Sequence, residues 1–246
     1  QQRWRLFGGQ VAAQAMRAAS LTVPEGRLIH SLHGYFLRPG DPERHTVLHV
    51  DRDRDGRSYS ARHVVARQHG DAIFTMLASF QVDEEGDEHQ EVAAPQVPRP
   101  DDLDPADVFG FGGMFEIRSV PMDGAPVHPG TPSSQFWART RSPLPDDPMV
   151  HLCVLTFLSD VSSGFFKLRD AGSPKGGPSL DHAVWFHRPV RMDDWVLVDL
   201  NPVQLASGRG YYTGGVFDPE GALVASISQE HIWRPFKMPP QPPPRA

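Results

Sequence analysis

The feature that most constrains the fold is an internal repeat, in which a helix-forming segment and four strand-forming segments occur twice in the same order. Phe36-Leu37-Arg38-Pro39 in the first half matches Phe186-His187-Arg188-Pro189 in the second. The last strand-forming runs of the two halves, at 77–81 and 224–229, both end in glutamine. An apolar helix needs a sheet to cover it. We therefore expect an α+β protein with two curved antiparallel sheets, each wrapped around a central helix.

The first copy begins with a helix predicted over residues 10–19, which are rich in alanine and methionine. Turn-forming Pro-Gly, Asp-Gly and Gly-Asp pairs separate the segments that follow. These segments predict four strands, over residues 29–37, 46–50, 58–68 and 72–81. We expect the four strands to form an antiparallel meander.

The second copy has two additional strands before its helix. The sequence predicts strands over 115–120 and 134–141, and then a helix over 148–159. This helix is apolar on nearly every side, which is typical of a buried helix. Four more strands are predicted after it, over residues 181–187, 195–200, 210–217 and 222–233.

An acidic, proline-rich segment lies between the two copies. Residues 83–108 contain ten acidic residues and one basic residue, so this segment has a net charge of −9. The whole chain has a net charge of −6, so the rest of the chain carries −6 + 9 = +3. The four prolines of the segment exclude a regular helix or a central strand. The predicted organisation is a first domain at 1–82, a linker at 83–110, a second domain at 111–238 and a proline-rich tail at 239–246. The acidic balance argues against a nucleic-acid partner, whereas +3 on the two domains suits a phosphate-bearing ligand.

Composition also bears on the compartment. The apolar runs are shorter than the ~20 residues that span a bilayer, so no membrane insertion is expected. The single cysteine, Cys153, excludes an internal disulfide and fits a reducing compartment. The N-terminal residues lack the pattern of a signal peptide. We expect a cytoplasmic protein in which Cys153, amid an apolar helix, is structural rather than reactive.

Five motifs resemble the acyl-CoA thioesterase II family in order and spacing, over nearly the whole chain. They lie at Phe7–Gln10, His30–Asp41, Arg54–Ser58, Ser179–Pro189 and Ala225–Glu230. The resemblance implies a double hotdog fold. It also implies hydrolysis of fatty acyl-CoA thioesters without a metal or redox cofactor. The family has a further strand before the first helix, which this sequence does not include.

The resemblance implies a catalytic site made of an aspartate, a serine or threonine, and a glutamine. We assign the aspartate to Asp181, which would activate water, and the glutamine to Gln229, which would hold that water. The hydroxyl position falls on Val203, and a shifted gap would place Ser207 or Gln204 there instead. A valine can neither hold nor activate water, which predicts weakened hydrolysis.

Two helix starts could supply the backbone N–H donors that stabilise an oxyanion. One start contains Gly8, Gly9 and Gln10, and the other contains His151. In the alternative interpretation, the two glycines only cap the helix. The acyl chain is expected beside apolar residues such as Phe157 and Leu158.

Arg57 and Arg209 occupy matching positions in the repeat, where they could bind the phosphates of CoA or form surface salt bridges. The pairs His30/His33 and His182/His187 do not predict zinc, because no cysteine accompanies them. The exposed sheet edges predict a homo-oligomer.

Two other functions stay open from the sequence. An acyl-CoA-binding protein with little or no hydrolase activity would explain Val203. A hotdog enoyl-CoA hydratase would need an aspartate–histidine pair. Asp181 and His182 are adjacent, so on a strand they point to opposite faces.

Overall fold

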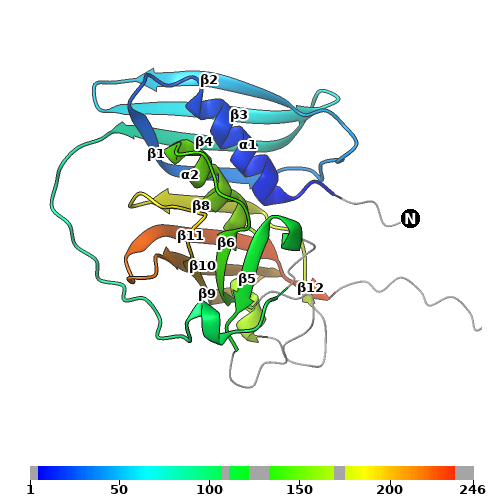
Figure 1. Cartoon of the computed structure of the whole chain (residues 1–246). Coiled ribbons are helices and arrows are strands. Elements are labelled where there is room, and N and C mark those ends of the chain that lie inside the picture. The colour runs from blue at the N-terminus through cyan, green and yellow to red at the C-terminus, as the bar shows by residue number, and fades with distance from the viewer. Residues whose placement is uncertain (1–4, 107–110, 122–132, 169–174, 236–246) are drawn as a thin grey trace, which may run out of the picture.

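The computed structural model describes residues 5–106, 111–121, 133–168 and 175–235. One ten-stranded antiparallel sheet has the strand order β2-β3-β4-β1-β8-β11-β10-β9-β6-β5. Two helices, α1 and α2, lie against the same face of this sheet (Figure 1). A separate small sheet pairs β7 (Lys175–Gly176) with β12 (Arg234–Pro235).

The first half contains the predicted helix and four strands. They are α1 (Gly8–Ser20), β1 (Arg27–Phe36), β2 (Val47–Asp55), β3 (Tyr59–Gln68) and β4 (Asp71–Val82). The buried face of α1 is made mostly of small residues, which allows the helix to lie close to the sheet and to α2. This face comprises Gly9, Val11, Ala12, Ala15, Met16 and Ala19.

The predicted meander is wrong in one pairing. Strands β2, β3 and β4 follow one another as expected, but β1 pairs with β4 and not with β2. The reason is the long connection at residues 37–46, which carries the chain from the end of β1 to the far edge of the half-sheet. By contrast, β3 and β4 are joined by a tight turn whose His69 and Gly70 both have positive φ.

The second half repeats this order and extends it. It contains β5 (Phe115–Ser119), β6 (Gln135–Thr140), α2 (Pro148–Leu158), β8 (Asp181–Phe186), β9 (Val196–Ala206), β10 (Arg209–Phe217) and β11 (Leu223–Ile232). Strands β8-β11-β10-β9 correspond to β1-β4-β3-β2, and the β5–β6 hairpin adds to the edge at β9. Short 3₁₀ helices lie at Phe111–Gly113 and Gly164–Leu168.

The two half-sheets join into one, whereas two separate sheets were expected. Strands β1 and β8 pair in antiparallel register from Ser31↔Trp185 to Tyr35↔Asp181. On the inner face, α1 and α2 contact each other, and the Thr156 hydroxyl, which donates to the Leu152 carbonyl at 2.8 Å, lies 3.3 Å from the Met16 sulfur. This seam brings the start of α1 next to the residues that follow α2.

Residues 83–106 pass over the second half with little regular structure, apart from a 3₁₀ helix at Pro100–Asp102. The Gln90 side-chain oxygen accepts from the Leu223 N–H at 2.7 Å, and the Trp137 indole donates to the Pro98 carbonyl at 3.0 Å. Residues 107–110 of the predicted linker and the predicted tail at 239–246 lie outside the described residues. In the described part of the chain, neither helix has the length and apolar character of a membrane span.

Candidate active site

Three polar side chains from separate elements meet where α2 ends and β8 begins. The Gln229 Nε2 group donates to Asp160 Oδ1 at 2.7 Å and to Ser179 Oγ at 2.6 Å. The Ser179 hydroxyl lies 3.5 Å from Asp160 Oδ1. We call these residues the Asp160–Ser179–Gln229 cluster.

The local fold explains why these side chains converge. Asp160 is the second residue after α2, and Ser179 lies just before β8. In β11, from Ala225 on, the side chains of Ala225, Ile227 and Gln229 are buried and the residues between them are only partly buried, as expected for a strand with one covered face. Gln229 therefore points toward the helices and is fully buried.

A second layer of buried groups lies behind Gln229. The Tyr212 hydroxyl, from β10, donates to Gln229 Oε1 at 2.6 Å, and His182 Nδ1, from β8, lies 2.6 Å from the same oxygen. The other ring nitrogen of His182 lies 2.7 Å from Ser159 Oγ. Burial lowers the pKa of His182 and raises that of Tyr212 well above its ordinary value, so both side chains are neutral near pH 7.

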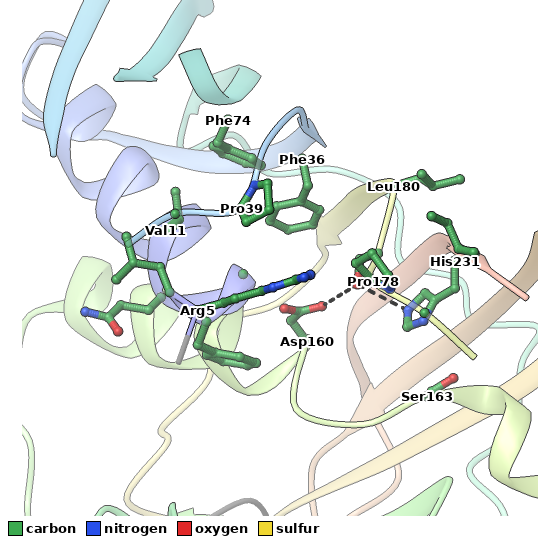
Figure 2. Close-up of a pocket in the computed structure, with 18 of the residues that line it drawn as sticks. Arg5, Val11, Phe36, Pro39, Phe74, Asp160, Ser163, Pro178, Leu180 and His231 are labelled. Atoms are coloured by element: carbon green, nitrogen blue, oxygen red, sulfur yellow. Dashed lines mark hydrogen bonds between the residues drawn. The ribbon is translucent and has the colours of Figure 1, made fainter. Parts of the chain in front are cut away.

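A cavity of about 980 Å³ borders the cluster (Figure 2). One wall is polar and contains Asp160, Ser163, Ser179 and His231. The opposite wall is apolar and comes mostly from the first half, with Phe7, Val11, Phe36, Ile73 and Phe74. The cavity therefore has an apolar wall on one side and a carboxylate on the other.

The start of α1 lies directly against the carboxylate of Asp160. A Cβ atom at Gly8 would be 2.6 Å from Asp160 Oδ2 and 2.9 Å from the Phe36 ring. Gly8 and Gln10 line the cavity. Gly9 instead packs on α2, since a Cβ there would be 2.5 Å from the Phe157 carbonyl oxygen.

The two helix starts differ in their free donors. At α2, the Asp147 side chain accepts from the Met149 N–H, and the Asp147 carbonyl accepts from the N–H groups of Val150 and His151. At α1, the N-cap residue is Phe7, which makes no side-chain cap hydrogen bond. The first N–H groups of α1 lack intrahelical acceptors, as at any helix start. They are therefore available to a ligand in the cavity.

His231 lies on the cavity wall, with its Nε2 atom 3.3 Å from Ser179 Oγ. The rings of Phe165 and Tyr212 pack against it. Burial lowers the pKa of His231 to about 4, so the imidazole is neutral near pH 7. A neutral ring can exchange a hydrogen bond with Ser179 but is a weak base.

Asp181 is not part of this cluster, contrary to expectation. Its carboxylate accepts from the Glu230 N–H at 2.7 Å and lies 3.2 Å from His33 Nε2. Because successive strand residues point to opposite faces, Asp181 faces outward while the neighbouring His182 faces Gln229. Asp181 and Gln229 thus cannot hold the same water molecule.

Val203 also lies apart from this cluster. Val203 lies in β9 at a shift of register, because Tyr211 pairs with Gln204 and Tyr212 pairs with Pro202, which leaves Val203 unpaired with β10. Its side chain is 55% exposed. It does not line the cavity. The hydroxyl of the cluster comes from Ser179, which belongs to a motif already recognised in the sequence.

Sequence reasoning missed Asp160, although a signal was present. Its carboxylate follows the C-terminal end of an apolar helix, where the helix dipole disfavours negative charge. An acidic residue in such a place calls for a partner or a function. The structure supplies the partner, Gln229, and the adjacent cavity.

Other predicted site residues lie elsewhere. His151 is buried, and its Nδ1 accepts from the Met192 N–H at 3.0 Å. Arg209 pairs with Glu230 at 2.8 Å. Neither these residues nor Arg57 line the cavity, whereas Arg5 and Arg38 do.

The apolar and sulfur-containing candidates have structural positions. Phe157 does not line the cavity but packs its ring against Phe7 and Phe111, which do, while Leu158 is buried in the core. Burial raises the pKa of Cys153 to about 11, which suits an unreactive thiol. Among the described residues, no group of three or more histidine, cysteine, aspartate or glutamate side chains could hold a metal.

Comparison with known proteins identifies relatives of the whole chain. Residues 1–81 match the family described as the acyl-CoA thioesterase N-terminal domain, and residues 87–232 match the acyl-CoA thioesterase C-terminal domain. Acyl-CoA thioesterase 2 of Haemophilus influenzae is 34% identical over 252 residues, covering 94% of this chain and 88% of that protein. Acyl-coenzyme A thioesterase 8 of Homo sapiens is 34% identical over 257 residues, covering 94% and 81%.

Solved structures agree with this relationship. The acyl-CoA thioesterase II TesB2 from Mycobacterium marinum has a TM-score of 0.81 at 41% identity, covering 94% of this chain and 90% of that one. A protein with the hot dog fold from Alicyclobacillus acidocaldarius has a TM-score of 0.74 at 22% identity, covering 93% and 87%. The second likeness supports the hot dog fold alone.

Proposed function

The chain belongs to the acyl-CoA thioesterase family and is a thioester hydrolase, and we propose that hydrolysis takes place at the Asp160–Ser179–Gln229 cluster. The observation that carries this proposal is the Asp160 carboxylate, which is held by Gln229, lies beside Ser179 and borders an apolar cavity. These three residue types are the ones that the family resemblance implies.

In the proposed mechanism, Asp160 removes a proton from water as that water attacks the thioester carbonyl carbon. A carboxylate within hydrogen-bond reach of the water can act as such a base. Oδ1 accepts from Gln229, and Oδ2 faces the start of α1, where the substrate carbonyl would lie. Collapse of the tetrahedral intermediate breaks the C–S bond, and the thiolate of CoA takes up a proton.

Ser179 is proposed to orient the water rather than to attack the substrate itself. A serine nucleophile needs a base, and the nearest imidazole, that of His231, has a pKa of about 4. The Ser179 hydroxyl lies 3.5 Å from Asp160 Oδ1 and 3.3 Å from His231 Nε2, so it stands between the carboxylate and the imidazole. A covalent acyl-serine detected by mass spectrometry of the quenched reaction would contradict this assignment.

The oxyanion is proposed to form at the start of α1. The first N–H groups of this helix lack a side-chain cap, and Gly8 and Gln10 border the cavity. Donors aimed at the place where negative charge develops lower the barrier of acyl transfer. The start of α2, with His151, is unsuited to this role because Asp147 already accepts from its amides.

The substrate is proposed to be a fatty acyl-CoA whose chain lies against the apolar wall made by Val11, Phe36 and Phe74. Arg5 and Arg38 replace Arg57 and Arg209 as candidates for the phosphates of CoA, because they border the cavity. An enoyl-CoA hydratase is not favoured, because Asp181 and His182 make no pair.

The organisation of the chain is proposed as a double hotdog, with domains at 1–82 and 111–238 and a linker at 83–110. The repeated strand order and the single helix of each half support this division. We also propose a homo-oligomer in the cytoplasm. Light scattering of the purified protein tests the oligomeric state.

Thiol release from a panel of acyl-CoA chain lengths tests the proposed site. Asp160→Asn removes the base while keeping the shape, and we expect kcat to fall about 10²- to 10⁴-fold. Asp181→Asn is the matched control, because this carboxylate faces the outer side of the sheet, and it should keep nearly full activity. The opposite pattern would return the catalytic role to Asp181.

A further inference from the structure

We propose that Tyr212 and His182 are positioning residues that fix the orientation of the Gln229 amide, and through it the positions of Asp160 and Ser179. The inference rests on the proposed function of the cluster. Tyr212 comes from β10 and His182 from β8, the two strands that flank β11. Gln229 is thus held by side chains from both neighbouring strands.

The hydrogen bonds of Gln229 use the whole amide. Its two hydrogens go to Asp160 and Ser179, and its oxygen accepts from Tyr212 and His182. A primary amide has two donor hydrogens and two acceptor lone pairs, so none remains for a water molecule. Gln229 therefore acts by holding Asp160 and Ser179, and its own orientation becomes the quantity that must be controlled.

Only one orientation of the amide is compatible with these neighbours. An amide turned by 180° would place its oxygen against the Asp160 carboxylate and its NH₂ group against the donors of Tyr212 and His182. The Tyr212 hydroxyl is 2.6 Å from Gln229 Oε1 but 3.3 Å from its other acceptor, the Ser162 carbonyl. The shorter bond decides where the hydroxyl hydrogen goes.

The same geometry fixes the tautomer of His182. A carbonyl oxygen only accepts, so the hydrogen of the neutral ring lies on Nδ1, and Nε2 is left as an acceptor. The Ser159 hydroxyl lies 2.7 Å from Nε2 and 2.8 Å from the Thr156 carbonyl, and in this tautomer its hydrogen goes to Nε2. The other tautomer would let Nδ1 accept from a turned amide. Ser159 thereby contributes to the orientation of Gln229 through His182.

Burial makes this arrangement costly to replace. Tyr212, His182 and Gln229 are all completely buried, so water does not compensate for a lost bond. The loss of one donor leaves the amide oxygen with a single partner and allows the turned state to be populated. The fraction of enzyme with a correctly placed carboxylate then falls, which lowers kcat more than it changes KM.

Tyr212→Phe tests the first donor, with Tyr211→Phe as its matched control. Tyr211 is the next residue of the same strand and points to the other face, where its hydroxyl accepts from Ser228 at 2.9 Å. We expect Tyr212→Phe to lower kcat about 5- to 10-fold, the equivalent of one net hydrogen bond, with KM changed less than about twofold. Tyr211→Phe should match the wild type.

The role of His182 is tested by two variants and by a spectrum that reports which ring nitrogen carries the hydrogen. His182→Leu removes the donor, whereas His182→Asn keeps an N–H close to the place of Nδ1, so the asparagine variant should recover much of the lost kcat. Side-chain ¹⁵N spectra of the wild type should contain a signal from a histidine protonated at Nδ1 alone that is absent from the spectrum of His182→Asn. The spectrum needs no substrate.

The outcomes separate this inference from the proposed function. Loss of activity in Asp160→Asn establishes the cluster first. If the wild type then hydrolyses substrate and Tyr212→Phe has the same kcat as Tyr211→Phe, the positioning role is overturned. A His182 ring protonated at Nε2 overturns it as well, whether or not His182→Leu folds.

Discussion

The two halves of the molecule place different chemistry at equivalent points of the repeat. Phe36 corresponds to Phe186, and the strand pairings counted from these two residues show which positions of the two half-sheets are equivalent. Leu32 faces Ala78 across β1 and β4, in the place where His182 faces Gln229 across β8 and β11. The site of the second half therefore has an apolar counterpart on these two strands of the first.

The remaining counterparts are Arg62 for Tyr212 and Thr22 for Asp160. Arg62 faces Ala78 as Tyr212 faces Gln229, and Thr22 follows α1 by two residues as Asp160 follows α2. Arg62 is fully buried and donates to both the hydroxyl and the carbonyl of Thr22. It also pairs with Asp55 at 2.7 Å.

The comparison shows how one repeat can carry two purposes. In the first half the hydrogen bonds of the buried Arg62 are made to other protein groups, Thr22 and Asp55 among them, and this cluster does not border the cavity. In the second half an equally buried layer supports a carboxylate that borders a cavity. The same backbone thus accommodates a closed polar cluster or one that borders a cavity, and the difference lies in a few inward-facing side chains.

The arginine of the matched Arg-Pro motifs differs in the same way. Arg38 and Arg188 each donate to a backbone carbonyl of the last strand of their half, at Ala72 and Leu223. Arg38 borders the cavity, whereas Arg188 pairs with Glu88 of the acidic segment at 3.6 Å. The acidic segment therefore contacts the arginine of the second half, whereas the arginine of the first half faces the cavity.

The largest effect in the first half is expected from Arg62→Met. It removes a buried guanidinium with its hydrogen bonds but keeps a long apolar stem, and it should lower the free energy of unfolding by about 3 kcal/mol. Chemical denaturation measures the loss. Below the melting temperature kcat should stay unchanged, because the cluster of the first half does not touch the cavity. A drop in kcat with intact folding would contradict the division of roles.

A smaller effect is expected from His231, whose counterpart in the first half is Phe80 by the same count. The folded-state pKa of about 4 lies below the ordinary value of 6.5. The unfolded chain therefore binds a proton first, and stability that is full above pH 6.5 is lost as pH falls to 4. The loss from this group is at most about 3 kcal/mol.

His231→Phe replaces the histidine with the residue type found at Phe80, its counterpart in the first half. This variant should lack the part of the pH dependence of the unfolding free energy that comes from His231. Unfolding free energies at pH 7 and pH 4.5, measured for the wild type and the variant, isolate it from the carboxylates common to both. Equal losses in the two proteins would refute the assignment of a buried neutral imidazole.

The smallest effect is expected from Gly8→Ala, which sharpens the difference between the two helix starts. The new methyl group would lie 2.6 Å from Asp160 Oδ2, so the carboxylate must move against its bond with Gln229. We expect kcat to fall about tenfold, since misplacement by a fraction of an ångström weakens an oriented reaction. Gly86→Ala, at a position with nothing within 4 Å, is the control.

The elements themselves were predictable, and the site was predictable in part. Hydrophobic patterns and turn pairs indicated α1, α2 and the long strands, because burial of one face leaves a periodic signal. The pairing of β1 with β4 depends on a connection that has no such signal. Gln229 was selected from its motif, but matching its position to Gln81 was wrong, since the register places Ala78 there.

The error over Asp181 has a simple physical origin. A strand motif does not say which of two adjacent polar residues faces the interior, and we expected Asp181, rather than His182, to lie next to Gln229. Asp160 lies in an irregular segment, where no periodicity reports direction. Contacts between residues far apart in the sequence, such as those of Asp160 with Ser179 and Gln229, 19 and 69 residues away, require the tertiary structure.

The pairing of β1 with β8 also has a consequence for how the enzyme behaves on dilution. The cavity takes one wall from each half, so two unlinked halves would have to find each other before any substrate could be bound. Because both halves belong to one chain, that encounter is intramolecular. Completion of the cavity within a chain is consequently a first-order event that does not depend on how much protein is present.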